Sequence, residues 1–291
     1  MKLITPIIIL LLTTSSALSQ ENSDILVPVK YVFWGSRLVD QQTTQTVGKG
    51  KYRIEILHRF GTVENGIEDN FGIYAPSNIS MGLGYGISDK IEIEFQSEKN
   101  NKVQEFGAKY KFLQQDVSGA MPVSLTYYLS LSADTHDSDY FGENYLFTDR
   151  LFYTNQLTVA RQFRYKFMTM MTFSYVHFNT VDESIQHDKM EINTAVGYKI
   201  SKKRSVFASY QIPWDVNIFR DNTTITSSPK QGLCFGLESA TRTHNFQVFI
   251  TSRDNISLGK DLVNNQNEIS LKNLRVGFNI RITLGEKHNS H

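Results

Sequence analysis

The stretch from Asn78 to Glu98 decides the fold of this chain, and it reads NISMGLGYGISDKIEIEFQSE. Apolar residues occupy every second position on both sides of a short polar break at residues 88–90, and glycine, serine and glutamate dominate the positions between them. A strict period of two on either side of a tight turn predicts an antiparallel β-hairpin with one apolar and one polar face. The apolar face must meet a protein core or lipid, and the rest of the chain has to distinguish these cases.

The composition narrows the choice of protein class. The chain has 291 residues and a formal net charge of +1, so it lacks the basic excess of a nucleic-acid binder, and no nucleic acid is expected as a partner. A mean hydropathy of −0.30 excludes a bundle of membrane helices, whereas a membrane barrel needs apolar residues only at alternate strand positions. The single cysteine, Cys234, excludes an internal disulfide and a cysteine metal cluster, and it is interpreted as a small strand residue.

The first 49 residues differ from those that follow. A positive start, an apolar run at residues 7–12 and the small-residue pattern Ala17-Leu18-Ser19 predict a cleaved secretory signal peptide over residues 1–19, with a buried first helix as the alternative. Residues 20–49 contain aromatic and polar stretches and end at Gly48-Lys49-Gly50. They are interpreted as a periplasmic segment or as a plug inside a lumen, and the sequence does not choose between the two.

From residue 51 onward the alternation recurs in about twelve segments, mostly near the ten residues that a tilted strand needs to cross a bilayer. The pattern is clearest over residues 274–283 and weaker over 151–161 and 167–178. No helical period competes with it after residue 50.

Short and long polar links alternate between these segments. The short links are residues 88–90, 163–165, 201–204 and 241–243. The long links are residues 63–76, 133–146, 179–189, 213–230 and 253–268. Two links break this order, since 98–102 is short where a long link is expected and 114–121 is long for a turn. The pattern predicts an all-β fold, a transmembrane antiparallel up-and-down β-barrel of about 12 strands over residues 50–285, followed by a tail at 286–291, with both chain ends in the periplasm.

The polar faces of the strands are expected to line the lumen. Their charged members are Arg53, Glu55, Arg59, Glu92, Glu94, Glu105, Lys109, Lys111, Glu191, Lys199, Glu238, Arg275 and Arg281. Glycines on the same faces, such as Gly84 and Gly232, would make room for these long side chains. Two interpretations stay open: an ion-pair network that fills a closed or narrow barrel, in which Arg59 and Glu55 pair with Glu92 or Glu94, and a constriction that sets selectivity.

Several short motifs resemble a known family. Ile56-Leu57-His58-Arg59-Phe60-Gly61 and the Tyr85–Lys90 turn YGISDK are followed by Lys109-Tyr110-Lys111 and Pro122-Val123-Ser124, and Trp34–Val39 (WGSRLV) precedes them. Together they resemble an uncharacterised family of outer-membrane β-barrel proteins of Gram-negative bacteria, known only as a domain of unknown function. The resemblance covers roughly residues 27–285 in layout and implies fold and location but no activity. The chain ends without the terminal aromatic residue that the outer-membrane assembly machinery reads in many barrels.

Three places in the sequence have residue types that could carry chemistry. His177 lies near a predicted outer rim, but Ser174 alternates to the opposite face and no Gly-x-Ser-x-Gly elbow is present, so no catalytic residue is assigned. His58 follows the apolar parity of its strand and is expected at the lipid–water boundary. The loop from Asp134 to Glu143 has alternating oxygen ligands that suit calcium, but it lacks the glycine and spacing of a calcium loop, so it is interpreted as a solvated loop with no metal or cofactor.

The sequence therefore predicts a porin-like outer-membrane protein that is not an enzyme. Its expected role is a narrow channel for small polar solutes or a structural barrel, in contact with the lipid bilayer and the outer-membrane assembly machinery. The alternatives are a receptor-like barrel that binds a partner with its long loops and a secreted soluble β-protein.

Overall fold

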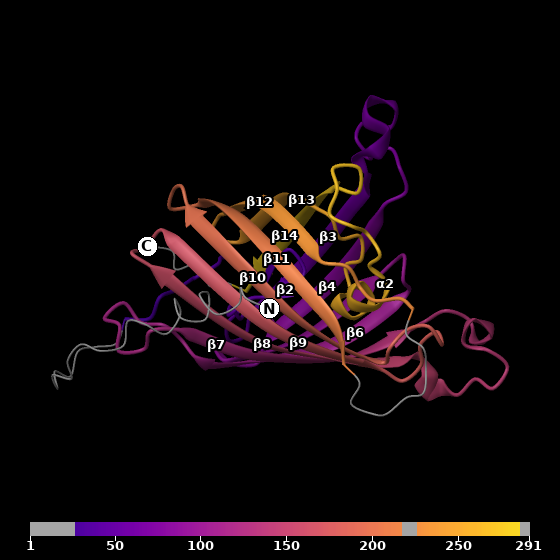
Figure 1. Ribbon diagram of the computed structural model, residues 1–291. Helices are drawn as coiled ribbons and strands as arrows, with labels where there is room; N and C mark the ends of the chain where they lie inside the picture. Colours follow the sequence, from indigo (N-terminus) through magenta and orange to yellow (C-terminus); the bar gives the residue numbers. More distant parts are fainter. Residues whose placement is uncertain (1–26, 217–225, 286–291) are drawn as a thin grey trace.

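The protein is a closed β-barrel in the computed structural model, which describes residues 27–216 and 226–285 (Figure 1). The predicted signal peptide at residues 1–19 and the tail at residues 286–291 lie outside the described residues. So does the beginning, residues 20–26, of the segment that precedes the barrel.

Twelve antiparallel strands form the barrel wall, as the alternation predicted. They are β3 (Tyr52–Thr62), β4 (Asn78–Gly86), β5 (Ile91–Glu98), β6 (Val103–Leu113), β7 (Ser124–Asp134), β8 (Leu151–Phe163), β9 (Phe167–Phe178), β10 (Asp188–Lys199), β11 (Arg204–Val216), β12 (Gly232–Ala240), β13 (His244–Thr251) and β14 (Arg275–Leu284). Each strand pairs with its neighbour in the sequence, and β14 pairs with β3 to close the sheet. Closure leaves no free strand edge, which a membrane-spanning sheet requires.

The hairpin of β4 and β5 has the predicted faces. Leu83 pairs with Phe95 on the outer face, and Gly84 pairs with Glu94 on the inner face. Leu83 is 60% exposed, whereas Glu92 on the inner face is 1% exposed. The barrel therefore presents its apolar row outward, where lipid covers it in a membrane, and encloses its carboxylates.

The two ends of the barrel differ in their links. The turn end carries the links 87–90, 114–123, 164–166, 200–203 and 241–243, together with the start of β3 and the end of β14. The loop end carries the links 63–77, 99–102, 135–150, 179–187 and 252–274, together with the described residues 226–231 before β12. Short 3-10 helices, at Val63–Asp69, Ser138–Phe141 and Phe147–Arg150, form parts of two loop-end links.

The weak alternation of β8 and β9 has a structural cause. Their inner faces carry apolar side chains, among them Phe152, Met168 and Met170, which are buried inside the barrel. A strand that is apolar on both faces loses its period of two. The expectation that polar faces line the whole lumen is therefore corrected, because part of the inner wall is apolar and packs against chain that lies inside the barrel.

One helix was not expected. The helix α2 (Leu258–Asn264) lies in the link between β13 and β14, where the sequence showed no helical period. It has only two turns, and nearly all of its residues are buried whatever their polarity, so no amphipathic stripe marks it. In residues 27–216 and 226–285, no helix is long and apolar enough to cross a membrane.

Candidate functional site: a lumen filled from both ends

The lumen contains residues 32–47, which we call the plug segment. The chain reaches it at the turn end, where the Val29 amide donates to the Gln115 carbonyl at 2.7 Å and the Val117 amide donates to the Val27 carbonyl at 2.8 Å. These contacts use link 114–123, which explains why this link is too long for a simple turn. The described part of residues 20–49 therefore begins at the turn end and continues into the barrel.

The plug segment turns back inside the barrel. Two short strands, β1 (Arg37–Leu38) and β2 (Gln41–Gln42), pair with each other, and Val39 adopts a positive φ of 61° at the reversal. The chain then returns to the turn end, where the Thr46 hydroxyl donates to the Asp89 carbonyl at 2.8 Å. The segment is a hairpin inserted into the lumen, and neither of its strands pairs with the barrel wall.

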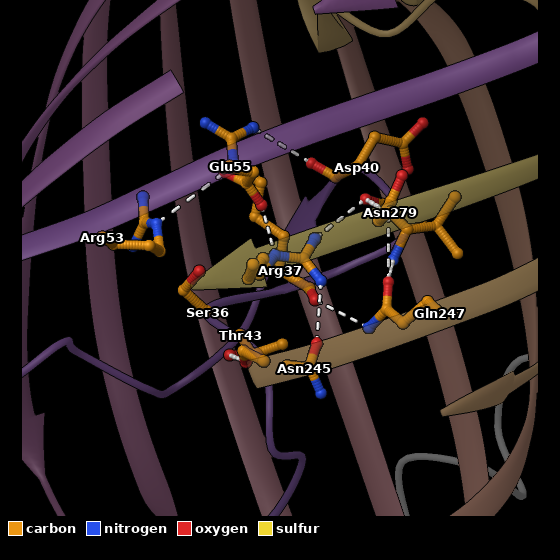
Figure 2. A network of polar contacts seen from close by, with 12 residues as sticks. Ser36, Arg37, Asp40, Thr43, Arg53, Glu55, Asn245, Gln247 and Asn279 are labelled. Carbon is orange, nitrogen blue, oxygen red and sulfur yellow. Dashed lines mark hydrogen bonds and ion pairs between the residues drawn. The ribbon is translucent and has the colours of Figure 1, made fainter. Parts of the chain in front are cut away.

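Amide side chains of the wall hold the tip of this hairpin (Figure 2). Gln247 accepts from the Val39 amide at 3.1 Å and donates to the Arg37 carbonyl at 3.0 Å. Asn279 donates to the Val39 carbonyl at 2.7 Å. Wall side chains therefore satisfy backbone groups that the two-residue strands leave unpaired.

Arg37 completes a network of arginines and glutamates. Its guanidinium contacts Glu94, lies 3.4 Å from Glu105 and lies 3.6 Å from Glu55. Burial alone lowers the pKa of Arg37, but the negative charges of Glu94 and its neighbours outweigh that effect and raise the pKa well above its ordinary value. The guanidinium therefore stays charged.

Two arginines of the wall bind the same carboxylates. Arg53 contacts Glu92 and Glu94, and Arg281 contacts Glu55. A Cβ on Gly84 would lie 3.1 Å from the Arg53 guanidinium carbon, which supports the expectation that inner glycines make room for long side chains.

The predicted pairing of Arg59 is wrong. Arg59 donates to the Asn279 side chain at 3.1 Å and lies over the Phe249 ring at 4.4 Å, while Arg53 takes Glu92 and Glu94. Six residues along a strand correspond to about 20 Å, so Arg53 and Arg59 lie at different depths.

Residues 252–274, which we call the α2 loop, enter the lumen from the loop end with their first part, residues 252–263, which is almost entirely buried. Glu98 accepts from the Ser257 amide at 2.9 Å, and Lys260 lies 2.6 Å from Asp134. Asn101 donates to Asn255 at 3.0 Å, so the short link 99–102 is covered by the α2 loop. An apolar cluster joins the helix to the wall through Leu258, Leu262, Val263, Val103, Phe152, Val176 and Phe178.

The two insertions meet at a group of side chains that we call the latch, namely Asp40, Gln211, Arg253 and Asp261. Arg253 binds Asp40 at 2.7 Å, donates to Gln211 at 2.7 Å and lies 4.0 Å from Asp261. Burial raises the pKa of Asp261 to about 7, although the charge of Arg253 opposes this. Three buried atoms of the latch have no hydrogen-bond partner in the described part of the chain: Asp40 Oδ2, Arg253 Nε and Asp261 Oδ1. Buried polar atoms of this kind are typical binding positions for water.

Most of the charged residues predicted to line the lumen contact the plug segment or Tyr31, the residue before it. Twelve of them are buried, and Arg275 is partly exposed at the loop end, 3.9 Å from Asp254. The members that contact residues 31–47 are Glu55, Glu92, Glu94, Glu105, Lys109, Lys199, Glu238 and Arg281. Lys111 and Glu191 are buried on the inner faces of β6 and β10. The sequence identified these wall residues but not Arg37, Asp40 or Arg253, which lie outside the alternating strands.

The other candidate residues occupy separate places. His177 faces outward and lies 2.9 Å from Asp188, whereas Ser174 faces inward and bonds to Gln156. His58 is also on the outer face and stacks on Phe278. Asp134 is held by Lys260 and His136, and the described residues contain no group of three or more metal-ligating side chains.

Comparison with known proteins gives a family match and similar solved structures. The sequence matches, over residues 33–284, the family described as a membrane bound beta barrel domain (DUF5777). It matches no curated protein. Among solved structures, an outer membrane channel from Pseudomonas putida F1 is 11% identical with a TM-score of 0.55, covering 83% of this chain and 98% of that chain.

Two porins match this chain at lower structural similarity. The KdgM porin is 8% identical with a TM-score of 0.48, and the NanC porin is 8% identical with a TM-score of 0.47. Each comparison covers 80% of this chain and 99% of the porin. At 11% identity, the likeness to the Pseudomonas putida channel concerns the barrel fold only.

Proposed function

The chain belongs to the membrane bound beta barrel domain family (DUF5777). We propose that it is an outer-membrane barrel closed at rest by its plug segment. When the segment moves, the lumen admits small polar solutes. The turn end faces the periplasm in this proposal, because barrels of this class have short periplasmic turns and longer outer loops. The cleaved signal peptide and recognition by the assembly machinery remain predictions.

One observation carries the proposal: residues 32–47 fill the lumen but contribute no strand to its wall. The twelve wall strands close through the pairing of β14 with β3, so the segment can leave without breaking a strand pair of the barrel. A permanent filler would gain most from an apolar interface. Here Gln247, Asn279 and the glutamates around Arg37 supply most of the specific contacts.

The polar character of this interface favours reversible displacement. A typical hydrogen bond contributes only about 0.5–1.5 kcal/mol net, because water replaces it when the groups separate. The apolar part of the interface contains Val32, Phe33, Leu38 and Val39 on the plug side, which belong to one buried cluster with wall residues. Movement of the segment therefore exchanges mainly polar contacts for water in a polar lumen.

A second candidate, a receptor-like barrel, has support at the loop end. The link 63–77 projects beyond the barrel rim in Figure 1, and its Ile67 and Tyr74 are 86% and 78% exposed. Large apolar side chains on a projecting loop are typical of a protein-binding site. Absence of enzymatic activity remains a prediction.

A reversible crosslink tests the plug proposal. In a Cys234→Ala background, Gln42→Cys and Thr158→Cys introduce thiols at contacting residues, since the Thr158 hydroxyl donates to the Gln42 carbonyl at 3.1 Å. In planar bilayers, oxidation should abolish brief openings, and reduction should restore them. The single variants control for the effect of the substitutions. A fully crosslinked protein that conducts like its reduced form would overturn the proposal.

A further inference from the structure

A cavity of about 800 Å³ lies at the turn end, between the plug segment and the links that surround it. Its wall combines residues 28–31, 34–36 and 45–47 with the turn-end links and strand ends at residues 199, 202–203 and 240–245. Cavities of about 300–1,000 Å³ are the usual size for small-molecule sites. The cavity thus has room for a soluble ligand of modest size.

The charge of this cavity is one-sided. Eight of its described lining residues are Lys or Arg, and none of them is Asp or Glu. Arg53 and Arg281 already bind glutamates deeper in the lumen. The other cationic lining residues are Lys30, Lys51, Lys199, Lys202, Lys203 and Arg242.

This concentration is local, because the whole chain has a net charge of only +1. The opposite end has acidic links, since residues 63–77 contain Glu64, Glu68 and Asp69 but no Lys or Arg. A concave site lined by one sign of charge focuses the field and attracts ions of the opposite sign. The field of this protein therefore favours an anion at the turn end and not at the acidic link.

Lys199 gives the cavity a buried cation. Its ammonium donates to the Tyr31 carbonyl at 2.9 Å and to the Gln162 side chain, and it lies 5.4 Å from the Trp34 ring centroid. No ion pair joins it to a carboxylate of the described chain. The nearby Glu238 instead accepts from the Gly35 amide at 3.1 Å and from Asn245 at 2.9 Å. A buried charge without a charged partner is costly, and an anion in the cavity would reduce that cost.

We infer that the turn-end cavity binds a small anion with two or more negative charges on phosphate or carboxylate groups. Several ammonium and guanidinium groups around one space suit a multiply charged anion better than a single charge. The site needs no movement of the plug segment, so this inference goes beyond the proposed function. Two sources share this chemistry, a soluble solute and the headgroup of an anionic lipid.

Trp34 provides a direct probe, because the chain has only two tryptophans and the other is Trp214. A Trp214→Phe protein in nanodiscs of zwitterionic lipid is titrated with inorganic tripolyphosphate, and binding is followed by Trp34 fluorescence and by calorimetry. A saturable response is expected. If nanodiscs containing cardiolipin, whose headgroup carries two phosphates, produce the fluorescence change before tripolyphosphate is added, and the titration then shows competition, the headgroup is the source. Without that change, a soluble anion is the source.

Matched variants separate this site from general attraction. Lys202→Gln with Lys203→Gln removes two exposed cavity charges, and Lys166→Gln with Arg204→Gln removes two exposed turn-end charges that do not line the cavity. The first pair should weaken binding roughly tenfold or more, and the control pair less than about threefold, because nearby charges interact more strongly than screened distant ones. Lys199→Gln should reduce both the affinity and the fluorescence change. Equal losses in the two pairs, or no saturable response in either lipid, would overturn the inference.

Discussion

Arg253 Nη2 lies 2.7 Å from Asp40 Oδ1, and this ion pair joins the α2 loop to the tip of the plug segment. The two residues are 213 positions apart in the sequence, and both are buried in the lumen. The plug segment and the α2 loop are therefore coupled, and a change in one of them should alter the stability of the other.

This coupling predicts a non-additive mutant cycle. Removing one partner of a buried ion pair costs about 3–5 kcal/mol, because the remaining charge loses its partner. Arg253→Gln should lower the free energy of unfolding more than Asp40→Asn, since it removes the guanidinium that lies within 4.0 Å of both Asp40 and Asp261. The double variant should be more stable than the sum of the single changes predicts, by at least about 1 kcal/mol, when unfolding in urea is measured in lipid vesicles. Additive effects would show that the two residues are not coupled.

The raised pKa of Asp261 predicts that channel opening depends on pH. Burial raises its pKa to about 7 in the closed lumen. The charged groups around it are Arg253, Asp40, Asp254, Glu191, Arg59 and Arg275. In water its pKa would return to about 3.9, so the closed state binds the proton more tightly. The resulting stabilisation is complete below about pH 4 and is lost as the pH rises through about 7. Channel openings in planar bilayers should be fewer at pH 5 than at pH 8.

The control for this prediction is Asp261→Asn, which cannot titrate. Its openings should change much less between pH 5 and pH 8 than those of the wild type. If the variant keeps the full pH dependence of the wild type, another group is responsible.

The absence of a side chain at Gly259 lets α2 pack closely against Phe152 of the barrel wall. A Cβ at this position would lie 2.5 Å from Phe152 Cε2, within the apolar cluster of the α2 loop. Gly259→Ala should therefore destabilise the loop by about 1–3 kcal/mol, the usual cost of overpacking. Trypsin added at the loop end should then cleave at Lys260, which is buried in the intact loop. A further Phe152→Leu change should reduce cleavage, and unchanged cleavage after Gly259→Ala alone would contradict this packing.

The orientation of the barrel predicts a labelling pattern. In a Cys234→Ala background, a cysteine at Asn65 should react with a membrane-impermeant thiol reagent added to whole cells. A cysteine at Lys202 should react only after the periplasm is opened. Labelling of both positions from the same side would contradict the barrel topology, and the reversed pattern would contradict the proposed orientation.

The sequence predicted the wall of this barrel better than its contents. Alternation from Asn78 to Glu98 places Leu83 outside and Glu92 inside, because the direction of a strand side chain depends only on local geometry. Alternation cannot show what an inner residue contacts. Arg37 and Glu94 meet across 57 positions, and Asp40 and Arg253 across 213, so no local pattern reports these pairs.

Some irregularities in the sequence did point to the contents of the lumen. Link 114–121 was too long for a turn because it holds the chain at Val29, and link 98–102 was short where the α2 loop covers it. The weak alternation of β9 came from Met168 and Met170, which belong to the apolar cluster that includes Phe33 and Leu38 of the plug segment. The helix α2 left no such trace, because its residues are buried on every side.

The central claim is that residues 32–47 close the lumen, and a deletion tests it most directly. The wall strands do not pair with these residues, so a variant that lacks them should still form a barrel, which heat-modifiable mobility on gels would verify. In planar bilayers at equal protein density, this variant should show discrete conductance steps far more often than the wild type. A correctly folded deletion variant that conducts no more often than the wild type would contradict the account.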